Sequence, residues 1–222
     1  MNNGEHLRGM RNEMTISDRD AVADGVFGFC YGMAMVDAIR RTRAAVRDER
    51  AMTVDDSMKD VYLKNESARE RVRCYIESIL IGAAEDPVAV IEDVEKLMGY
   101  EEFTFGNAQK LVNMTAKYIF VSTYADSDLR TRFNACHCPM DGAMLKKAKD
   151  NYGSMNMQDK EKIDRLLEGT EWEHRPKSLL NEPWSRATAE RPQYKVFQGI
   201  IRMQSQKEGF SPLEYDIVHW KQ

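Results

Sequence analysis

The sequence lacks any apolar run close to the ~20 residues that a membrane-spanning helix requires. Its first residues, MNNGEHLRGMRNEM, lack the apolar core of a secretory signal peptide. Internal repeats, low-complexity tracts and strand-like alternation of apolar and polar residues are missing as well. These absences predict a cytoplasmic protein that makes no membrane contact, and they argue against a β-sheet fold.

Cysteine is scarce, with four residues in a chain of 222: Cys30, Cys74, Cys136 and Cys138. Such a low count is not typical of a disulfide framework. Cys136 and Cys138 are too close in sequence to bridge easily, and the other two fall within apolar helical patterns. We therefore expect buried free thiols.

An excess of positive charge is also lacking, since the formal net charge is −4. Indiscriminate coating of nucleic acid requires a broadly basic surface, which this composition excludes. Basic residues are nevertheless clustered, from Arg40 to Arg50 and between Lys110 and Lys149, whereas acidic residues concentrate between Glu85 and Glu102. Such clusters are usually solvated helix faces. A local basic face for a nucleic acid is the alternative.

What is present is helical periodicity. Asp18 or Asp20 is expected to cap the first helix, which extends to about residue 46 with an apolar stripe of Val22, Val26, Phe29, Met33, Val36 and Ile39. Three glycines in it, Gly25, Gly28 and Gly32, predict either a closely packed neighbour or a break. Further helices are expected over about 57–84, 87–97, 104–121, 126–132, 141–150, 158–168, 192–204 and 212–220.

Local signals mark several helix ends. Asp86-Pro87, Thr104 and Ser211-Pro212 are typical helix starts, and Gly99 is a typical helix end. Residues 169–192 hold three prolines and two tryptophans, which predicts an ordered irregular segment. We predict an all-α protein with a loose segment over residues 1–16 and a single globular helical domain over 17–222.

One candidate binding element is Phe105-Gly106-Asn107-Ala108-Gln109-Lys110. A glycine just inside a helix start lets backbone N–H groups approach an anion, and the positive end of the helix favours a phosphate. Gly106, Asn107, Gln109 and Lys110 are therefore candidate phosphate-binding residues. The alternative is a glycine that permits tight packing.

A second element is Cys136-His137-Cys138. These residues are too crowded to ligate one tetrahedral zinc together, and His174 is the only distant imidazole that could join them before the C-terminus. We therefore predict no metal and no cofactor. His137 is expected to be a hydrogen-bonding core residue, with a catalytic role as the alternative.

The third element is Pro139-Met140-Asp141. An aspartate after a proline at a helix start is an ordinary N-cap. The functional alternative is a carboxylate that faces a cleft and is kept ionised by the helix dipole. There it could orient a water molecule or stabilise positive charge at a sugar carbon.

Together, the glycine turn with its lysine and the later Pro-hydrophobic-Asp resemble the helix-hairpin-helix DNA glycosylase family over residues 95–150. The resemblance implies that Gly106 and Lys110 hold a DNA phosphate. It also implies that Asp141 assists cleavage of the N-glycosidic bond of a flipped-out base. Trp184 and Trp220 are candidates for base stacking, although packed core tryptophans are more common.

Three functions remain open at this point, and so does whether the protein is an enzyme. The first is a nucleic-acid-associated protein with glycosylase-like hydrolase activity in a cleft that includes Asp141 and His137. The second is a non-catalytic protein-interaction or regulatory protein, and the third is an enzyme acting on a small nucleotide. The basic clusters favour the first. The overall acidity favours the second, and so does Thr104, which stands where the family has another glycine.

Overall fold

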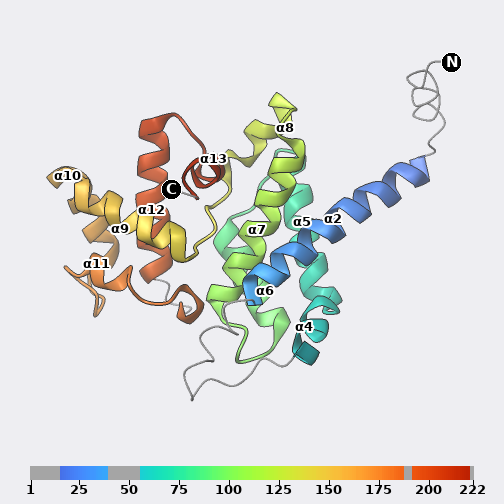
Figure 1. Cartoon of the computed structure of the whole chain (residues 1–222), viewed down its shortest axis with the longest axis horizontal. Helices are drawn as coiled ribbons and strands as arrows, with labels where there is room; N and C mark the ends of the chain where they lie inside the picture. The colour runs from blue at the N-terminus through green and yellow to red at the C-terminus, as the bar shows by residue number, and fades with distance from the viewer. Residues whose placement is uncertain (1–15, 40–55, 188–191, 221–222) are drawn as a thin grey trace.

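The computed structural model describes residues 16–39, 56–187 and 192–220, and its side chains from Ala23 and, after the first gap, from Asp60. These residues form helices and loops without a strand (Figure 1), so the all-α prediction is confirmed. The expected loose N-terminal segment and the Arg40–Arg50 basic run lie outside the described residues, apart from Ile16. Within the described residues, no helix is both long and apolar enough to cross a membrane.

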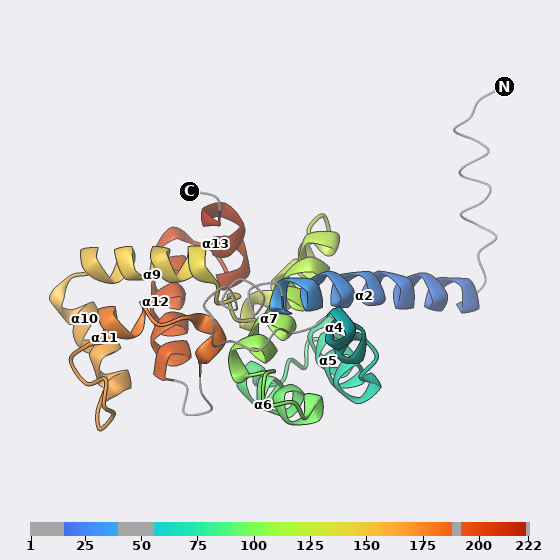
Figure 2. The same cartoon turned by 60° about the horizontal axis from the view of Figure 1, so that its bottom comes forward.

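Helix α7 (Phe105–Thr123) lies at the centre between two groups of helices (Figures 1 and 2). The first group is α2 (Ile16–Ile39), α4 (Asp56–Leu63), α5 (Glu66–Leu80), α6 (Pro87–Met98) and α8 (Ser127–Arg132). The second group is α9 (Gly142–Ser154), α10 (Met157–Asp164), α11 (Pro176–Leu179), α12 (Pro192–Glu208) and α13 (Pro212–His219). Single turns of 3₁₀ helix complete the chain: η1 (Phe133–Ala135), η2 (Arg165–Leu167) and η3 (Trp184–Arg186).

Helix α7 is buried over most of its length because it receives helices on opposite sides. Leu111, Ala116 and Phe120 are fully buried, and one continuous core joins both groups of helices. Helices α2 and α6 pack along α7 from one side, and η3 contacts it from the other. Any polar side chain that α7 carries towards the second group must therefore find a partner inside the protein.

The helix signals in the sequence are confirmed. Asp86 caps α6 and Gly99 ends it in the left-handed conformation, while Thr104 caps α7 and Ser211 caps α13, each in a capping box. These signals act through side chain to backbone hydrogen bonds within one turn, so they need no tertiary contact. Residues 169–187 form the expected ordered irregular segment, with α11 and η3 inside it.

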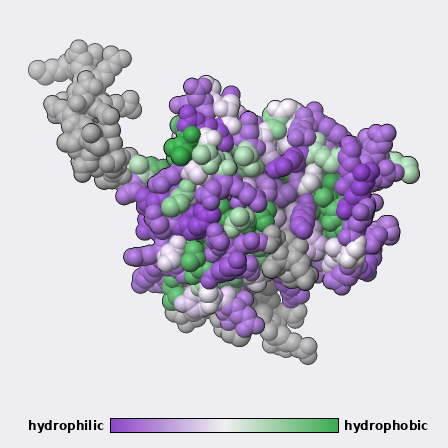
Figure 3. Space-filling model, turned by 180° about the vertical axis from the view of Figure 1, so that it is seen from behind, coloured by the Kyte–Doolittle hydropathy of each residue, from purple (hydrophilic) through white to green (hydrophobic). Residues whose placement is uncertain are grey.

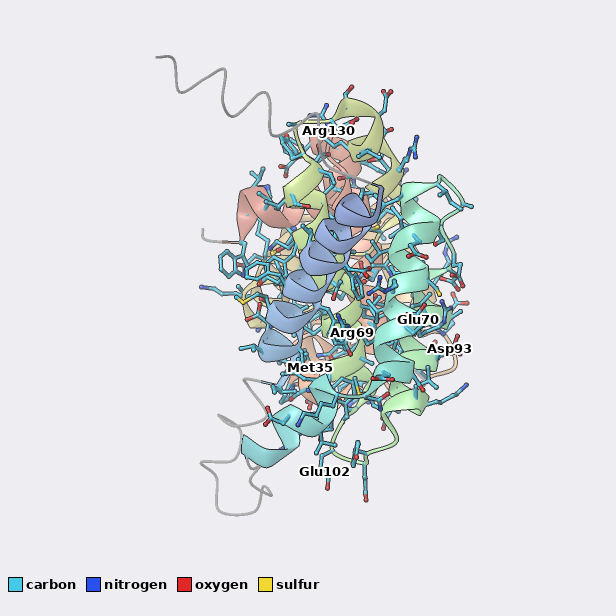
Figure 4. The ribbon with its side chains drawn as sticks, turned by 90° about the vertical axis from the view of Figure 1, so that its right-hand side faces the viewer. Met35, Arg69, Glu70, Asp93, Glu102 and Arg130 are labelled. Atoms are coloured by element: carbon cyan, nitrogen blue, oxygen red, sulfur yellow. The ribbon has the colours of Figure 1, made fainter. Side chains whose placement is uncertain are left out.

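Helix α2 corrects three expectations. It begins at Ile16, before Asp18 and Asp20, and it continues unbroken past its glycines. Only Gly28 meets a close described neighbour, the guanidinium of Arg69, which lies where α5 faces α2 (Figure 4). Most of the expected apolar stripe faces outward, since Phe29 is 70% exposed and Val26 and Met33 are each 43% exposed, whereas Ile39 is buried as expected. Tyr31 and Met35 are buried instead.

Three smaller expectations were also wrong. The helix expected over 57–84 is two helices, because Asn65 accepts a hydrogen bond from the Ala68 amide and starts α5 afresh. Cys74 is exposed rather than buried, although all four cysteines are free thiols as expected. The charged helix expected over 158–168, with Ile163, Leu166 and Leu167 facing inward, is α10 followed by η2, and Leu166 is 42% exposed.

The surface is predominantly polar. On the face opposite to that of Figure 1, hydrophilic side chains dominate and apolar groups are scattered between them (Figure 3). The first turns of α2 extend beyond the helices that it packs on (Figures 1 and 2).

Candidate functional site

Helix α7 carries two lysines into the protein interior. Lys110 and Lys117 are 7% and 8% exposed, and their spacing of seven residues places them on one face of the helix, about 10 Å apart along its axis. Lysine is almost never buried to this extent without a partner. This face of α7 is turned towards η3, α13 and the start of α9, which supply partners of the two lysines.

Each lysine lies between a carboxylate and an indole ring. Lys117 Nζ is 2.6 Å from Asp216 Oδ2 and 5.0 Å from the centre of the Trp220 ring. Lys110 Nζ is 3.9 Å from Asp141 Oδ2 and 4.8 Å from the Trp184 ring. Both lysines are thus held by an ion pair and a cation–π contact.

The two halves are connected. Trp220 Nε1 donates a 3.4 Å hydrogen bond to Asp141 Oδ2, so that the indole over one lysine contacts the carboxylate beside the other. We name these six residues the lysine–aspartate cluster: Lys110, Lys117, Asp141, Trp184, Asp216 and Trp220. Trp220 is 45% exposed and Asp141 is partly exposed, so the cluster reaches the surface at these two side chains.

Asp141 has two roles in this arrangement. Its Oδ1 accepts hydrogen bonds of 2.9 Å from the amides of Ala143 and Met144, and the predicted N-cap of α9 is confirmed. Its other oxygen, Oδ2, faces Lys110 and Trp220. The helix start thus fixes one oxygen and directs the second into the cluster.

The loop that leads to Asp141 is held by two glutamine side chains. Gln109 donates to the Met140 carbonyl at 2.8 Å and accepts from the Met140 amide at 3.0 Å. Gln198 does the same for Cys138, at 2.7 and 3.2 Å. Each amide satisfies both backbone groups of one loop residue, as a neighbouring strand would, and the position of Asp141 is fixed as a result.

His137 belongs to the support of this loop. Its Nδ1 lies 2.9 Å from the Tyr194 hydroxyl, which also accepts a hydrogen bond from Asn113 at 2.9 Å. Burial, together with the charge of Arg202 and against the charge of Asp86, lowers the pKa of His137 to about 4. The imidazole is therefore neutral near pH 7, and His137 is a hydrogen-bonding residue of the interior, as expected.

Asp216 is the most buried charge of the cluster, at 1% exposure. Burial raises its pKa to about 6; Lys117 and Lys110 oppose the rise, and Asp141 adds to it. Its Oδ1 has no hydrogen-bond donor among the described residues. Two neighbouring carboxylates therefore sit in different surroundings, which is the arrangement that separates an acid from a base in catalytic sites.

A groove of about 570 Å³ adjoins the cluster. It lies between α9 and the segment that leads into η3, and Trp184 belongs to both the groove and the cluster. Gly142, which follows Asp141 in sequence, also lines it. The complete lining is Gly142, Leu145, Lys146, Lys149, Leu180, Asn181, Glu182, Pro183, Trp184 and Ser185.

The four residues expected to bind phosphate lie in different surroundings. Only Lys110 belongs to the lysine–aspartate cluster. A Cβ on Gly106 would lie 2.0 Å from the Trp184 carbonyl oxygen, so this glycine permits close packing of η3 on α7. Asn107 closes the capping box and donates to the Ala38 carbonyl, and Gln109 holds the loop.

Lys117 and Asp216 were missed by the sequence reasoning. A signal for Lys117 exists, since Lys110 and Lys117 recur at a helical interval among the apolar residues of α7. No local signal marks Asp216, which reads as an ordinary polar residue of α13. The candidate stacking residues Trp184 and Trp220 both belong to the cluster, where each ring contacts a lysine.

In the described part of the chain, no group of three or more histidine, cysteine or acidic residues could hold a metal ion.

The chain was compared with protein families, curated proteins and solved structures, and nothing matched in any of the three comparisons. The function must therefore be argued from the cluster itself.

Proposed function

We propose that the lysine–aspartate cluster binds a nucleotide unit, free or within a nucleic acid, and cleaves its N-glycosidic bond. The observation that carries the proposal is the burial of two lysines and two aspartates around two indole rings. Removing charges from water is expensive, and apolar residues of similar volume would stabilise a core at least as well. A buried, partly accessible set of charges is therefore a candidate for function.

The chemistry follows from the groups present. Cleavage of an N-glycosidic bond develops positive charge at the sugar carbon and negative charge on the departing base. Asp141 would stabilise the sugar cation and take a proton from the attacking water. Asp216, with a pKa of about 6, would donate its proton to the base. This is the division of labour between two carboxylates in glycoside hydrolysis.

The lysines and indoles would provide binding. Ammonium groups attract phosphate, and an indole offers a face on which any base can stack. Trp220 is the half-exposed ring and its contacts to Asp141 and Lys117 close the accessible side of the cluster. A substrate would replace these contacts by its own.

The experiment that tests catalysis is the release of free base by purified protein from oligonucleotides and mononucleotides, followed chromatographically. We expect Asp141→Asn to lower the rate by about 100-fold or more. Asparagine also caps helices, so α9 should keep its start. Asp126→Asn is the matched control, because Asp126 caps α8 in the same way. It should release base at the wild-type rate.

Binding is tested separately, by titrating single-stranded and duplex DNA across a salt series. Lys110→Met should bind more weakly than wild type and show a salt slope smaller by about 1. No binding at low salt together with no base release from any substrate would overturn the proposal.

A second candidate is a non-catalytic interaction protein, and one observation favours it. An apolar groove of about 510 Å³ lies between α2 and α7, lined by Val26, Phe29, Tyr118 and Val121 among others. Phe29, at 70% exposure, is the most exposed of these. A second copy of the chain could cover this groove, since two α2 helices related by a twofold axis would bury the exposed apolar side chains of both copies.

Sedimentation at increasing concentration tests this candidate. Wild type should dimerise and Phe29→Glu should remain monomeric. A wild type that stays monomeric throughout would argue against self-association through this surface.

A further inference from the structure

The groove beside the lysine–aspartate cluster indicates which class of substrate the site accepts. This inference rests on the proposed function. We infer that this groove receives the phosphate and sugar of a mononucleotide, so that the substrate is a free nucleoside mono- or diphosphate and not an internal position of a duplex. The place of the groove, its size and its charges all support such a ligand.

The groove adjoins the proposed site through two of its lining residues. Gly142 lines it and is the first residue of α9, immediately after Asp141. Trp184 lines it and also lies beneath the ammonium of Lys110. A molecule seated in the groove would therefore contact Trp184 of the cluster and the residue that follows Asp141.

The size of the groove suits a small molecule. At about 570 Å³, it falls within the range of roughly 300–1,000 Å³ that is usual for small-molecule and cofactor sites. A nucleotide is of a size that suits such a volume. The net charge of −4 also suits a small ligand better than a polyanion.

Two lysines supply the charge for a phosphate. Lys146 and Lys149 both line the groove, and their spacing of three residues places them on one face of α9. Lys149 Nζ is 2.6 Å from Asn181 Oδ1, across the groove. This contact orients the ammonium and leaves N–H groups that can bind phosphate oxygens.

Glu182 is the one acidic residue in the lining. A carboxylate accepts hydrogen bonds from sugar hydroxyls, as an acidic residue does at dinucleotide sites. Its presence beside two lysines favours a ligand that carries both a ribose and a phosphate. Inorganic phosphate alone would leave Glu182 without a partner from the ligand.

The test is calorimetric titration of wild type with nucleoside monophosphates, nucleoside diphosphates and the matching nucleosides. We expect the Lys146→Ala/Lys149→Ala variant to lose nucleotide affinity by about tenfold or more, because charge-assisted contacts to phosphate are removed. Nucleoside affinity should stay within twofold. Lys147→Ala is the matched control, since Lys147 lies between the two on α9 but does not line the groove.

The outcomes separate this inference from the proposed function. If the Lys146→Ala/Lys149→Ala variant binds nucleotides as wild type does, while Asp141→Asn loses base release, the groove inference is wrong and the catalytic proposal stands. Release of base from oligonucleotides but not from mononucleotides would also overturn the inference. Absence of both base release and nucleotide binding in wild type would overturn the two together.

Discussion

Helix α7 supports two polar regions of opposite character. One is a neutral network that contains Gln109, Asn113 and Tyr194 and extends to His137 in the 136–141 loop. The other is the lysine–aspartate cluster, built from charged side chains at similar burial. Both are joined to the same core, and the cluster also reaches the surface at Trp220 and Asp141.

The contrast between the two regions indicates a different role for each. In the neutral network nearly every group has a partner, and only Asn113 Oδ1 lacks a donor among the described residues. Such a network adds specificity to a loop at little energetic penalty. The cluster carries charges whose desolvation is not fully repaid, because the pKa of Asp216 is raised to about 6 despite the neighbouring Lys117. We interpret the first region as support and the second as the functional one.

The largest expected effect comes from breaking the buried ion pair. Lys117→Met leaves Asp216 without its cation and should lower the free energy of unfolding by about 3–5 kcal/mol. Adding Asp216→Leu should restore stability to within about 1 kcal/mol of wild type, because an apolar pair replaces the charges. Urea unfolding at pH 7 measures both, and ligand binding should be lost in both variants.

Lys147→Met is the control for the loss of one lysine at a less buried position, and it should change stability by no more than about 0.5 kcal/mol. If the Lys117→Met/Asp216→Leu variant is as unstable as Lys117→Met alone, the ion pair stabilises the fold. The interpretation of the cluster as the functional region and of the neutral network as support would then be wrong.

The second effect is a dependence of the free energy of unfolding on pH. The pKa of Asp216 is about 6 in the folded protein, against an ordinary value of 3.8. Between these two pH values the folded state therefore holds a proton that the unfolded state has lost. The contribution of Asp216 is fully present below about pH 4 and is lost as the pH rises through about 6, by about 3 kcal/mol in total. Asp216→Asn removes this dependence.

Urea unfolding of wild type and Asp216→Asn at several pH values between 4 and 7 provides the measurement. The stability of wild type relative to the variant should fall across this range. A constant difference between the two proteins would mean that Asp216 titrates normally and is better solvated than its burial indicates.

The smallest effect belongs to the neutral network. Tyr194→Phe removes the hydroxyl between His137 and Asn113 and should destabilise the protein by about 1–2 kcal/mol. Activity of the cluster should change little, because the loop keeps its bonds to Gln109 and Gln198. Tyr124→Phe, at a 48% exposed position, is the control in thermal and urea unfolding. A larger loss of activity than of stability in Tyr194→Phe would place the network within the functional site.

Sequence reasoning succeeded where structure is decided within a few residues. The caps at Asp86, Thr104 and Asp141 are confirmed, since each uses a hydrogen bond inside its own first turn. It failed for the buried face of α2, because that face depends on how α2 meets α7. It also missed the break at Asn65, where the cap interrupts an otherwise continuous apolar pattern.

The candidate site shows the same division. Asp141 and Lys110 could be singled out from local patterns, and both belong to the cluster. Lys117 was recognisable only as a polar residue in an apolar helix, and Asp216 not at all. The glycine turn was identified correctly as a special position, but the backbone of η3 occupies the space beside Gly106.

Periodicity and hydrogen bonds between near neighbours were enough to predict the all-α class, most of the helices and their main start signals. The packing of the helices brings the two lysines of α7 to aspartates from the start of α9 and from α13, and to indoles from η3 and the end of α13. These contacts join distant segments around one helix face, and no local pattern specifies them.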